Sequence, residues 1–107
     1  MKWNKSYAHA KLRETIYSLA IGSGDVRKRL AQSYLVFFTL KEEDFPEELQ
    51  SSWEWVQKEL KRFGPIKRDD GSIFRGSVEN TCSKIKNKTG VKIAKRLLEM
   101  YTFLESY

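Results

Sequence analysis

The sequence predicts an all-α fold, a compact single-domain bundle of about five helices covering residues 1–107, with a loop or small β-hairpin at about residues 65–76. Apolar residues recur at the spacing of a helix over most of the 107-residue chain. Two prolines and six glycines are too few for a disordered or all-β chain. Hydrophobic residues make up 40% of the sequence, which is enough for one core in a domain of this length.

The first helix is expected at about residues 6–20. Tyr7, Leu12 and Ile16 lie near helical spacing. Gly22 follows them, and because glycine accepts the left-handed conformation that closes many helices, we expect it to end this one.

The second helix is expected at about residues 25–40. Its apolar face is formed by Val26, Leu30, Phe37 and Phe38. Residues 34–38 (YLVFF) are apolar on every side, so this segment must be buried or cover a partner.

The third helix has the clearest periodicity. Five apolar residues step by four, three, four and three along the chain: Leu49, Trp53, Val56, Leu60 and Phe63. Asp44 is expected to cap its start, Pro46 suits its first turn, and Gly64-Pro65 stops it. We expect this helix near the centre of the bundle.

Residues 65–76 (PIKRDDGSIFRG) form the longest stretch without helical periodicity. Asp70-Gly71 is a turn signal between short apolar segments, which is compatible with a β-hairpin. A two-stranded hairpin needs something to pack against, so a plain loop is an equal alternative.

Two further helices are expected after this stretch. Ser77 should cap the fourth, whose apolar face is formed by Val78, Cys82 and Ile85. The fifth is expected at about residues 90–105, with an apolar face formed by Ile93, Ala94, Leu97, Leu98, Tyr101 and Leu104. The sequence is compatible both with a break at Thr89-Gly90 and with one continuous helix. Ile85 and Ile93 would lie on the same helical face in either case.

Composition limits the class of protein. No apolar run approaches the roughly 18–20 residues of a membrane span, and the start lacks the apolar centre of a signal peptide. The single cysteine, Cys82, excludes an intrachain disulfide, so the reducing cytoplasm is the expected location. His9 is the only histidine, and the acidic clusters occupy helix starts and turns. We therefore expect no metal site, no cofactor and no enzymatic activity.

The net charge of +6 is unevenly distributed. Residues 1–30 hold seven cations and two acids, residues 31–60 two cations and seven acids, and residues 61–107 eleven cations and five acids. Two basic ends flanking an acidic middle fit either a polyanionic partner or charge complementarity within the molecule.

The main candidate site is the basic stretch at residues 84–96 (KIKNKTGVKIAKR), which holds six cations and no acid. Read as one helix, it places positions 84, 88, 92 and 95/96 along one face, where these cations could contact successive phosphates of a nucleic acid. A solvated helix face or a surface for an acidic protein are the alternatives. Lys67 and Arg68 in the preceding loop would extend the patch. The candidate nucleic-acid-binding residues are Arg75, Lys84, Lys88, Lys92, Lys95 and Arg96.

A second candidate is a glycine-rich loop before the second helix that could bind an anion. Its residues are Gly22, Gly24, Arg27 and Arg29. The favoured alternative is a simple turn in which Asp25 caps the helix, because a carboxylate there repels a phosphate.

The third candidate is an apolar surface for a protein partner or a second copy of the chain. Trp55 lies off the stripe of the third helix, and with Trp3 and Phe38 it could contact a partner. The sequence thus predicts a non-catalytic cytoplasmic binding module that binds nucleic acid through a basic C-terminal helical face. The alternative is a protein-interaction or homo-oligomerising helical module.

Overall fold

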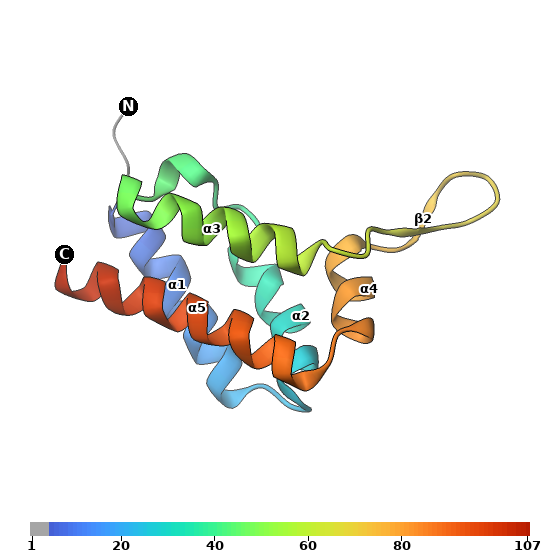
Figure 1. The fold of residues 1–107 in the computed structure, drawn as a ribbon, viewed down its shortest axis with the longest axis horizontal. Coiled ribbons are helices and arrows are strands. Elements are labelled where there is room, and N and C mark those ends of the chain that lie inside the picture. Colours follow the sequence, from blue (N-terminus) through green and yellow to red (C-terminus); the bar gives the residue numbers. More distant parts are fainter. Residues whose placement is uncertain (1–4) are drawn as a thin grey trace.

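The computed structural model describes residues 5–107 and confirms the all-α prediction (Figure 1). Its α-helices are α1 (Lys5–Ile21), α2 (Val26–Phe37), α3 (Glu47–Leu60), α4 (Ser77–Lys84) and α5 (Asn87–Ser106). Shorter elements are the 3₁₀ turn η1 (Glu42–Asp44) and the strands β1 (Ile66–Lys67) and β2 (Ile73–Arg75). Trp3, one of the apolar-surface candidates, lies outside the described residues.

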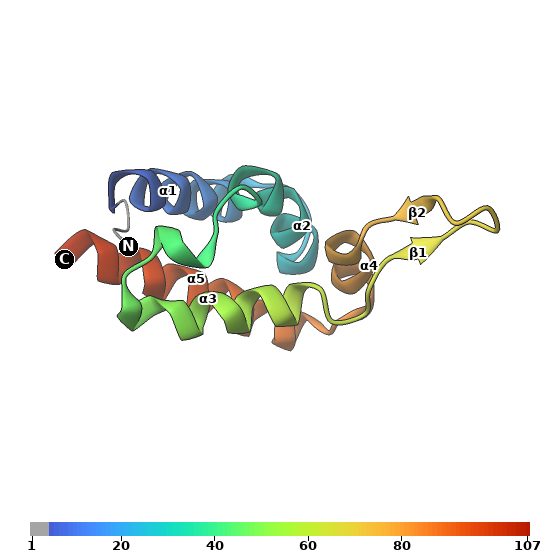
Figure 2. The ribbon, with the colours of Figure 1, turned by 90° about the horizontal axis from the view of Figure 1, so that it is seen from above.

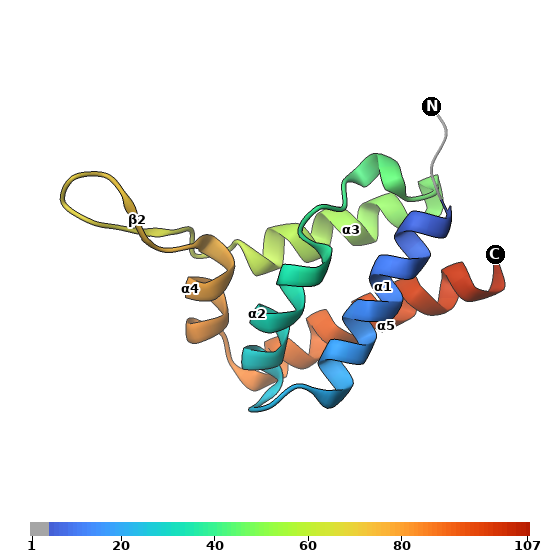
Figure 3. The same ribbon diagram turned by 180° about the vertical axis from the view of Figure 1, so that it is seen from behind.

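The helices form two layers, with α1 and α2 over α3 and α5 (Figure 2). Helix α5 packs against α1, α2 and α3, and Figure 3 shows α1 crossing it. The prediction that the third helix lies near the centre is therefore wrong, because α2 and α5 each pack against three other helices and α3 packs against two. Helix α4 packs against α2 and α3 at one end of the molecule.

The core is one cluster of buried side chains to which all five helices contribute. Among its fully buried members are Leu12, Leu30, Phe37, Val56, Leu60, Ile93, Leu97, Met100 and Leu104. The predicted stripe of the third helix is confirmed for Leu49, Trp53, Val56 and Leu60. Phe63 lies beyond the end of α3 and is exposed, and Phe38 and Leu98 are also exposed, so their assignment to apolar faces is wrong.

The YLVFF segment at the end of α2 divides between core and solvent. Phe37 is fully buried and meets the Trp53 ring edge-on at a centroid distance of 5.9 Å. Leu35 is 73% exposed and Phe38 is 58% exposed. One side of the segment is thus core, and the other is apolar surface facing solvent.

Two predicted helix caps are wrong in detail. The Asp44 carboxylate accepts a hydrogen bond from the Lys41 backbone N–H at 2.8 Å within η1, and Pro46 takes the N-cap position of α3. At α4 the N-cap residue is Gly76, and Ser77 is the first helical residue. Both helices still begin within a residue or two of the expected place.

Helices α4 and α5 are separated by Ile85 and Lys86, which both have extended backbones. The two alternatives drawn from the sequence, a break at residues 89–90 and one continuous helix, are therefore wrong. Gly90 lies buried inside α5, where it allows α2 to approach closely. A β-carbon at Gly90 would lie 3.0 Å from Cγ1 of Val26.

Residues 66–75 form a β-hairpin, so the alternative of a plain loop is wrong. Strand β1 pairs antiparallel with β2, with Ile66 opposite Arg75. Gly71 turns the tip with a φ of +88°, as the Asp-Gly signal indicates. The hairpin projects from the helical body beyond α4, at the end opposite the start of α1 and the end of α5 (Figures 1 and 3).

Candidate functional site

The outer face of α5 carries a row of exposed lysines. Gly90, Ile93 and Leu97 turn towards the core, so the opposite side of the helix faces solvent. On that side lie Lys88, Lys92 and Lys95, with Lys84 and Lys86 at the α4–α5 junction. Within residues 5–107, none of these five lysines takes part in an ion pair. We call these five residues the lysine surface.

The break between α4 and α5 changes the geometry of this surface. Lys84 is the last residue of α4, so the interpretation of residues 84–96 as one helical face is wrong for this residue. Its ammonium nitrogen lies 5.8 Å from the ring centroid of Phe63, which precedes the hairpin. The lysine surface therefore runs from α5 across the junction to the base of the hairpin.

Arg96 and Trp55, candidates for two different sites, lie against each other. The Arg96 guanidinium carbon is 4.5 Å from the Trp55 ring centroid, and its Nε is 3.8 Å from a Glu99 carboxylate oxygen. This contact joins α5 to α3 and half-buries Trp55. Unlike the five lysines, Arg96 has a carboxylate partner within the described residues. The pairing could not be read from the sequence, because nothing there places α3 beside α5.

Arg75 lies at the base of the hairpin, on β2. Its Nε is 3.6 Å from a Glu79 carboxylate oxygen, and its guanidinium carbon is 6.0 Å from the ring centroid of Phe74. Arg68 lies 5.4 Å from the same centroid. The structure thus brings Arg68 and Arg75 together around an exposed phenylalanine that the sequence analysis did not single out.

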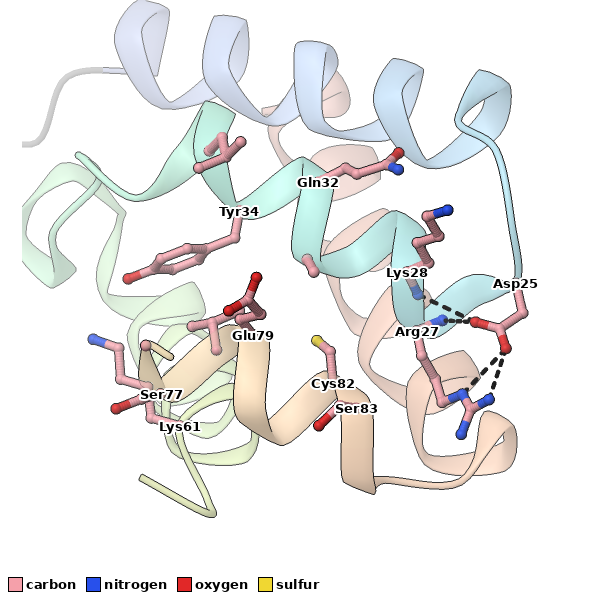
Figure 4. Close-up of a pocket in the computed structure, with 14 residues that line it drawn as sticks. Asp25, Arg27, Lys28, Gln32, Tyr34, Lys61, Ser77, Glu79, Cys82 and Ser83 are labelled. Atoms are coloured by element: carbon pink, nitrogen blue, oxygen red, sulfur yellow. Dashed lines mark hydrogen bonds and ion pairs between the residues drawn. The ribbon is translucent and has the colours of Figure 1, made fainter. Parts of the chain in front are cut away.

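The glycine-rich loop has the geometry of a capped turn. The Asp25 carboxylate accepts hydrogen bonds from the backbone N–H groups of Arg27 and Lys28 at 3.0 and 3.2 Å (Figure 4). It also pairs with the Arg27 side chain at 2.8 Å, and that guanidinium lowers the pKa of the carboxyl group. Arg27 in turn donates to the Ile85 carbonyl at 3.0 Å, which ties the loop to the α4–α5 junction.

The other loop candidates also have structural partners. Arg29 donates a hydrogen bond to the Leu19 carbonyl at 2.8 Å. The left-handed residue is Gly24, with a φ of +84°, so the prediction that Gly22 adopts this conformation is wrong. Gly22 instead allows a close approach, because a β-carbon there would lie 2.9 Å from Cγ of Arg29.

A groove of about 880 Å³ lies between α2 and α4 (Figure 4). Ala31, Val78 and Cys82 contribute apolar side chains to it, and Lys61 and Glu79 contribute charged ones. Sequence reasoning missed this groove because no periodicity indicates that α2 and α4 are neighbours. The inward orientation of Val78 and Cys82 on the fourth helix was the only available signal.

The Cys82 thiol is buried, and loss of hydration raises its pKa to about 11. Because the thiolate is the reactive form, we expect the folded protein to react with iodoacetamide at pH 8 at least tenfold more slowly than the protein in denaturant. Mass spectrometry of timed samples would measure this difference. Equal rates in the two states would show that Cys82 is accessible.

No cluster of three or more histidine, cysteine, aspartate or glutamate side chains that could hold a metal ion occurs in the described part of the chain. His9 is engaged by α5, with its Nε2 2.6 Å from a Glu105 carboxylate oxygen and its ring stacked on Tyr101. No helix in residues 5–107 has the length and apolarity needed to cross a membrane.

Comparison with known proteins gives no match, whether to a protein family, a curated protein or a solved structure.

Proposed function

We propose that this protein is a non-catalytic binding module of the cytoplasm that binds nucleic acid through the lysine surface. The observation that carries this proposal is the absence of carboxylate partners for these five exposed lysines within the described residues. No acid occurs between Glu79 and Glu99 in the sequence. Neighbouring lysines one helical turn apart repel each other, and the phosphates of a polyanion would relieve that repulsion.

The distribution of the acids supports the same proposal. Five of the seven acids of residues 31–60 lie in η1 and the first turn of α3: Glu42, Glu43, Asp44, Glu47 and Glu48. These two elements lie beside the start of α1 and the end of α5, far along the molecule from the hairpin and the start of α5 (Figure 1). A polyanion could therefore approach the lysine surface without meeting these five acids.

Charge reversal on α5 tests the proposal. We expect Lys88→Glu, Lys92→Glu and Lys95→Glu together to lower nucleic-acid affinity by at least a hundredfold at about 50 mM salt, because three phosphate contacts become repulsive. Fluorescence anisotropy of a labelled oligonucleotide would measure the loss. Replacing the same lysines by arginine should preserve affinity, because phosphate contacts require positive charge.

A second triple variant controls for net charge. Lys5→Glu, Lys11→Glu and Lys41→Glu produce the same charge change on α1 and beside η1. We expect this variant to bind within a few-fold of the parent, since its changes lie away from the lysine surface. Equal losses in both triple variants would indicate a response to net charge alone and would contradict a localised site.

A protein-interaction module is the second candidate function, favoured by the exposed apolar residues of α2. Leu35 and Phe38 lie one helical turn apart, and Leu35 also borders the groove between α2 and α4. Exposed neighbours of this kind are typical of protein interfaces. A dimer at micromolar concentration on a sizing column, together with no oligonucleotide binding, would favour this function over the first.

A further inference from the structure

The β-hairpin is an arm that exposes two of its apolar side chains to solvent. Ile73 and Phe74 on β2 are both exposed, Phe74 by 58%. A short two-stranded hairpin normally keeps its shape by packing on other elements. Here the tip is held by its own polar contacts. The Arg68 guanidinium donates to the Ile73 carbonyl at 2.9 Å, and the Asp70 carboxylate accepts from the Ser72 backbone N–H at 2.9 Å.

The exposed Phe74 ring has two cations beside it. The Arg68 and Arg75 guanidinium carbons lie 5.4 and 6.0 Å from its centroid. Both distances exceed the 4.5 Å between Arg96 and Trp55, so neither guanidinium covers the ring closely. An aromatic ring that presents open π surface beside positive charge suits a flat base attached to a phosphate.

The arm itself carries little net charge. Lys67, Arg68 and Arg75 are offset by Asp69 and Asp70 at the tip. Hydrogen bonds from Ser72 lower the pKa of the Asp70 carboxyl, so it is charged at neutral pH. Attraction of phosphate is therefore mainly a property of the lysine surface, and the distinctive feature of the arm is its exposed ring.

The arm and the lysine surface are continuous. Phe63 lies between them, with Lys84 over its ring and its backbone N–H bonded to the Thr81 hydroxyl of α4 at 3.1 Å. A nucleic-acid strand whose phosphates follow the lysines of α5 would thus reach the base of the hairpin. We infer that Phe74 stacks on an unpaired base of that strand and that the ligand of this protein is single-stranded nucleic acid.

This inference rests on the proposed function and specifies its substrate class. In a duplex the faces of the bases are covered by their neighbours, whereas an unpaired base can leave the stack and lie on an aromatic side chain. Stacking of this kind tolerates any base, because every base has a π face. The hairpin therefore supplies preference for single strands, and the lysine surface supplies affinity without sequence information.

Four single variants test the inference by anisotropy titration with labelled oligo(dT) and with a duplex of equal length. Phe74→Ala and Phe74→Leu should weaken oligo(dT) binding roughly tenfold, because both remove the π face and leucine retains apolar character. Phe74→Tyr should bind like the parent. Ile73→Ala, an apolar change at the preceding residue of β2, which is 50% exposed against 58% for Phe74, should also bind like the parent.

Salt dependence and duplex binding separate the role of Phe74 from that of the lysines. Losing a stacked base removes no phosphate contact, so the slope of log affinity against log salt should be unchanged in Phe74→Ala. The triple charge reversal on α5 should reduce that slope. Duplex affinity should be the same for Phe74→Ala and the parent.

Each of the other possible results of these titrations contradicts the role of Phe74, the preference for single strands or the proposed function. If Phe74→Ala binds oligo(dT) like the parent while the charge reversal abolishes binding, the inference fails and the proposed function stands. Equal losses for oligo(dT) and duplex would overturn the preference for single strands. Normal binding by Phe74→Leu would show that apolar contact, not stacking, is what the ring provides. If the parent binds neither form at about 50 mM salt, the proposed function fails together with the inference.

Discussion

Replacing Phe37 by alanine is expected to lower the free energy of unfolding by about 3–5 kcal/mol. The ring is fully buried at the end of α2 and packs edge-on against Trp53 of α3, which in turn lies 4.9 Å from the Phe45 ring. Truncation would leave a cavity between the two helix layers. A protein of this size has a total stability of roughly 5–15 kcal/mol, so urea unfolding should show a large shift of the midpoint.

The neighbouring residue provides a matched control. Phe38→Ala removes the same atoms one position along the chain, where the ring is 58% exposed. We expect this variant to change stability by less than about 0.5 kcal/mol. Similar losses for the two variants would mean that the end of α2 is packed differently from the structure described above.

Gly90→Val is expected to destabilise the protein by about 2–3 kcal/mol. The new β-carbon would lie 3.0 Å from Cγ1 of Val26 and 3.4 Å from Cγ of Arg27, so α2 and α5 would have to separate. Helix propensity alone predicts the opposite sign, since valine is a better helix former than glycine. The sign of the change in urea midpoint therefore distinguishes close packing from local propensity.

A double variant identifies the contact responsible. Val26→Ala removes the methyl carbon that the new β-carbon would meet, so part of the cost of Gly90→Val should disappear in its presence. Lys88→Val, on the exposed side of the same helix, should cost no more than about 0.7 kcal/mol. Additive effects at residues 26 and 90 would contradict the proposed approach of the two helices.

Elements that depend on local pattern could be predicted from the sequence. The stripe from Leu49 to Leu60 repeats at helical spacing, and Asp70-Gly71 is a turn signal, so the third helix and the hairpin turn lie where expected. The break at Ile85-Lys86 could not be predicted. The sequence leaves open whether the helix breaks at Gly90. In the structure Gly90 lets α2 approach α5, and that role depends on which helices are neighbours.

The candidate site could be predicted where it depends on charge, but not where it depends on which helices are neighbours. Charge is visible in the sequence, so Lys88, Lys92 and Lys95 belong to the basic face predicted for residues 84–96. The contact of Arg96 with Trp55 depends on the pairing of α5 with α3. The exposure of Phe74 could not be predicted, because an apolar residue in a hairpin normally packs against the rest of the protein. Its side chain is exposed because the arm projects from the helical body.

The most direct test of nucleic-acid binding is an anisotropy titration of the unmodified protein with labelled single-stranded DNA, RNA and duplex DNA at about 50 and about 200 mM salt. We expect micromolar or tighter binding to the single strands, weakening with salt by a log–log slope of about 0.7 for each phosphate contacted. The absence of binding to all three nucleic acids at the lower salt concentration would contradict the proposed function.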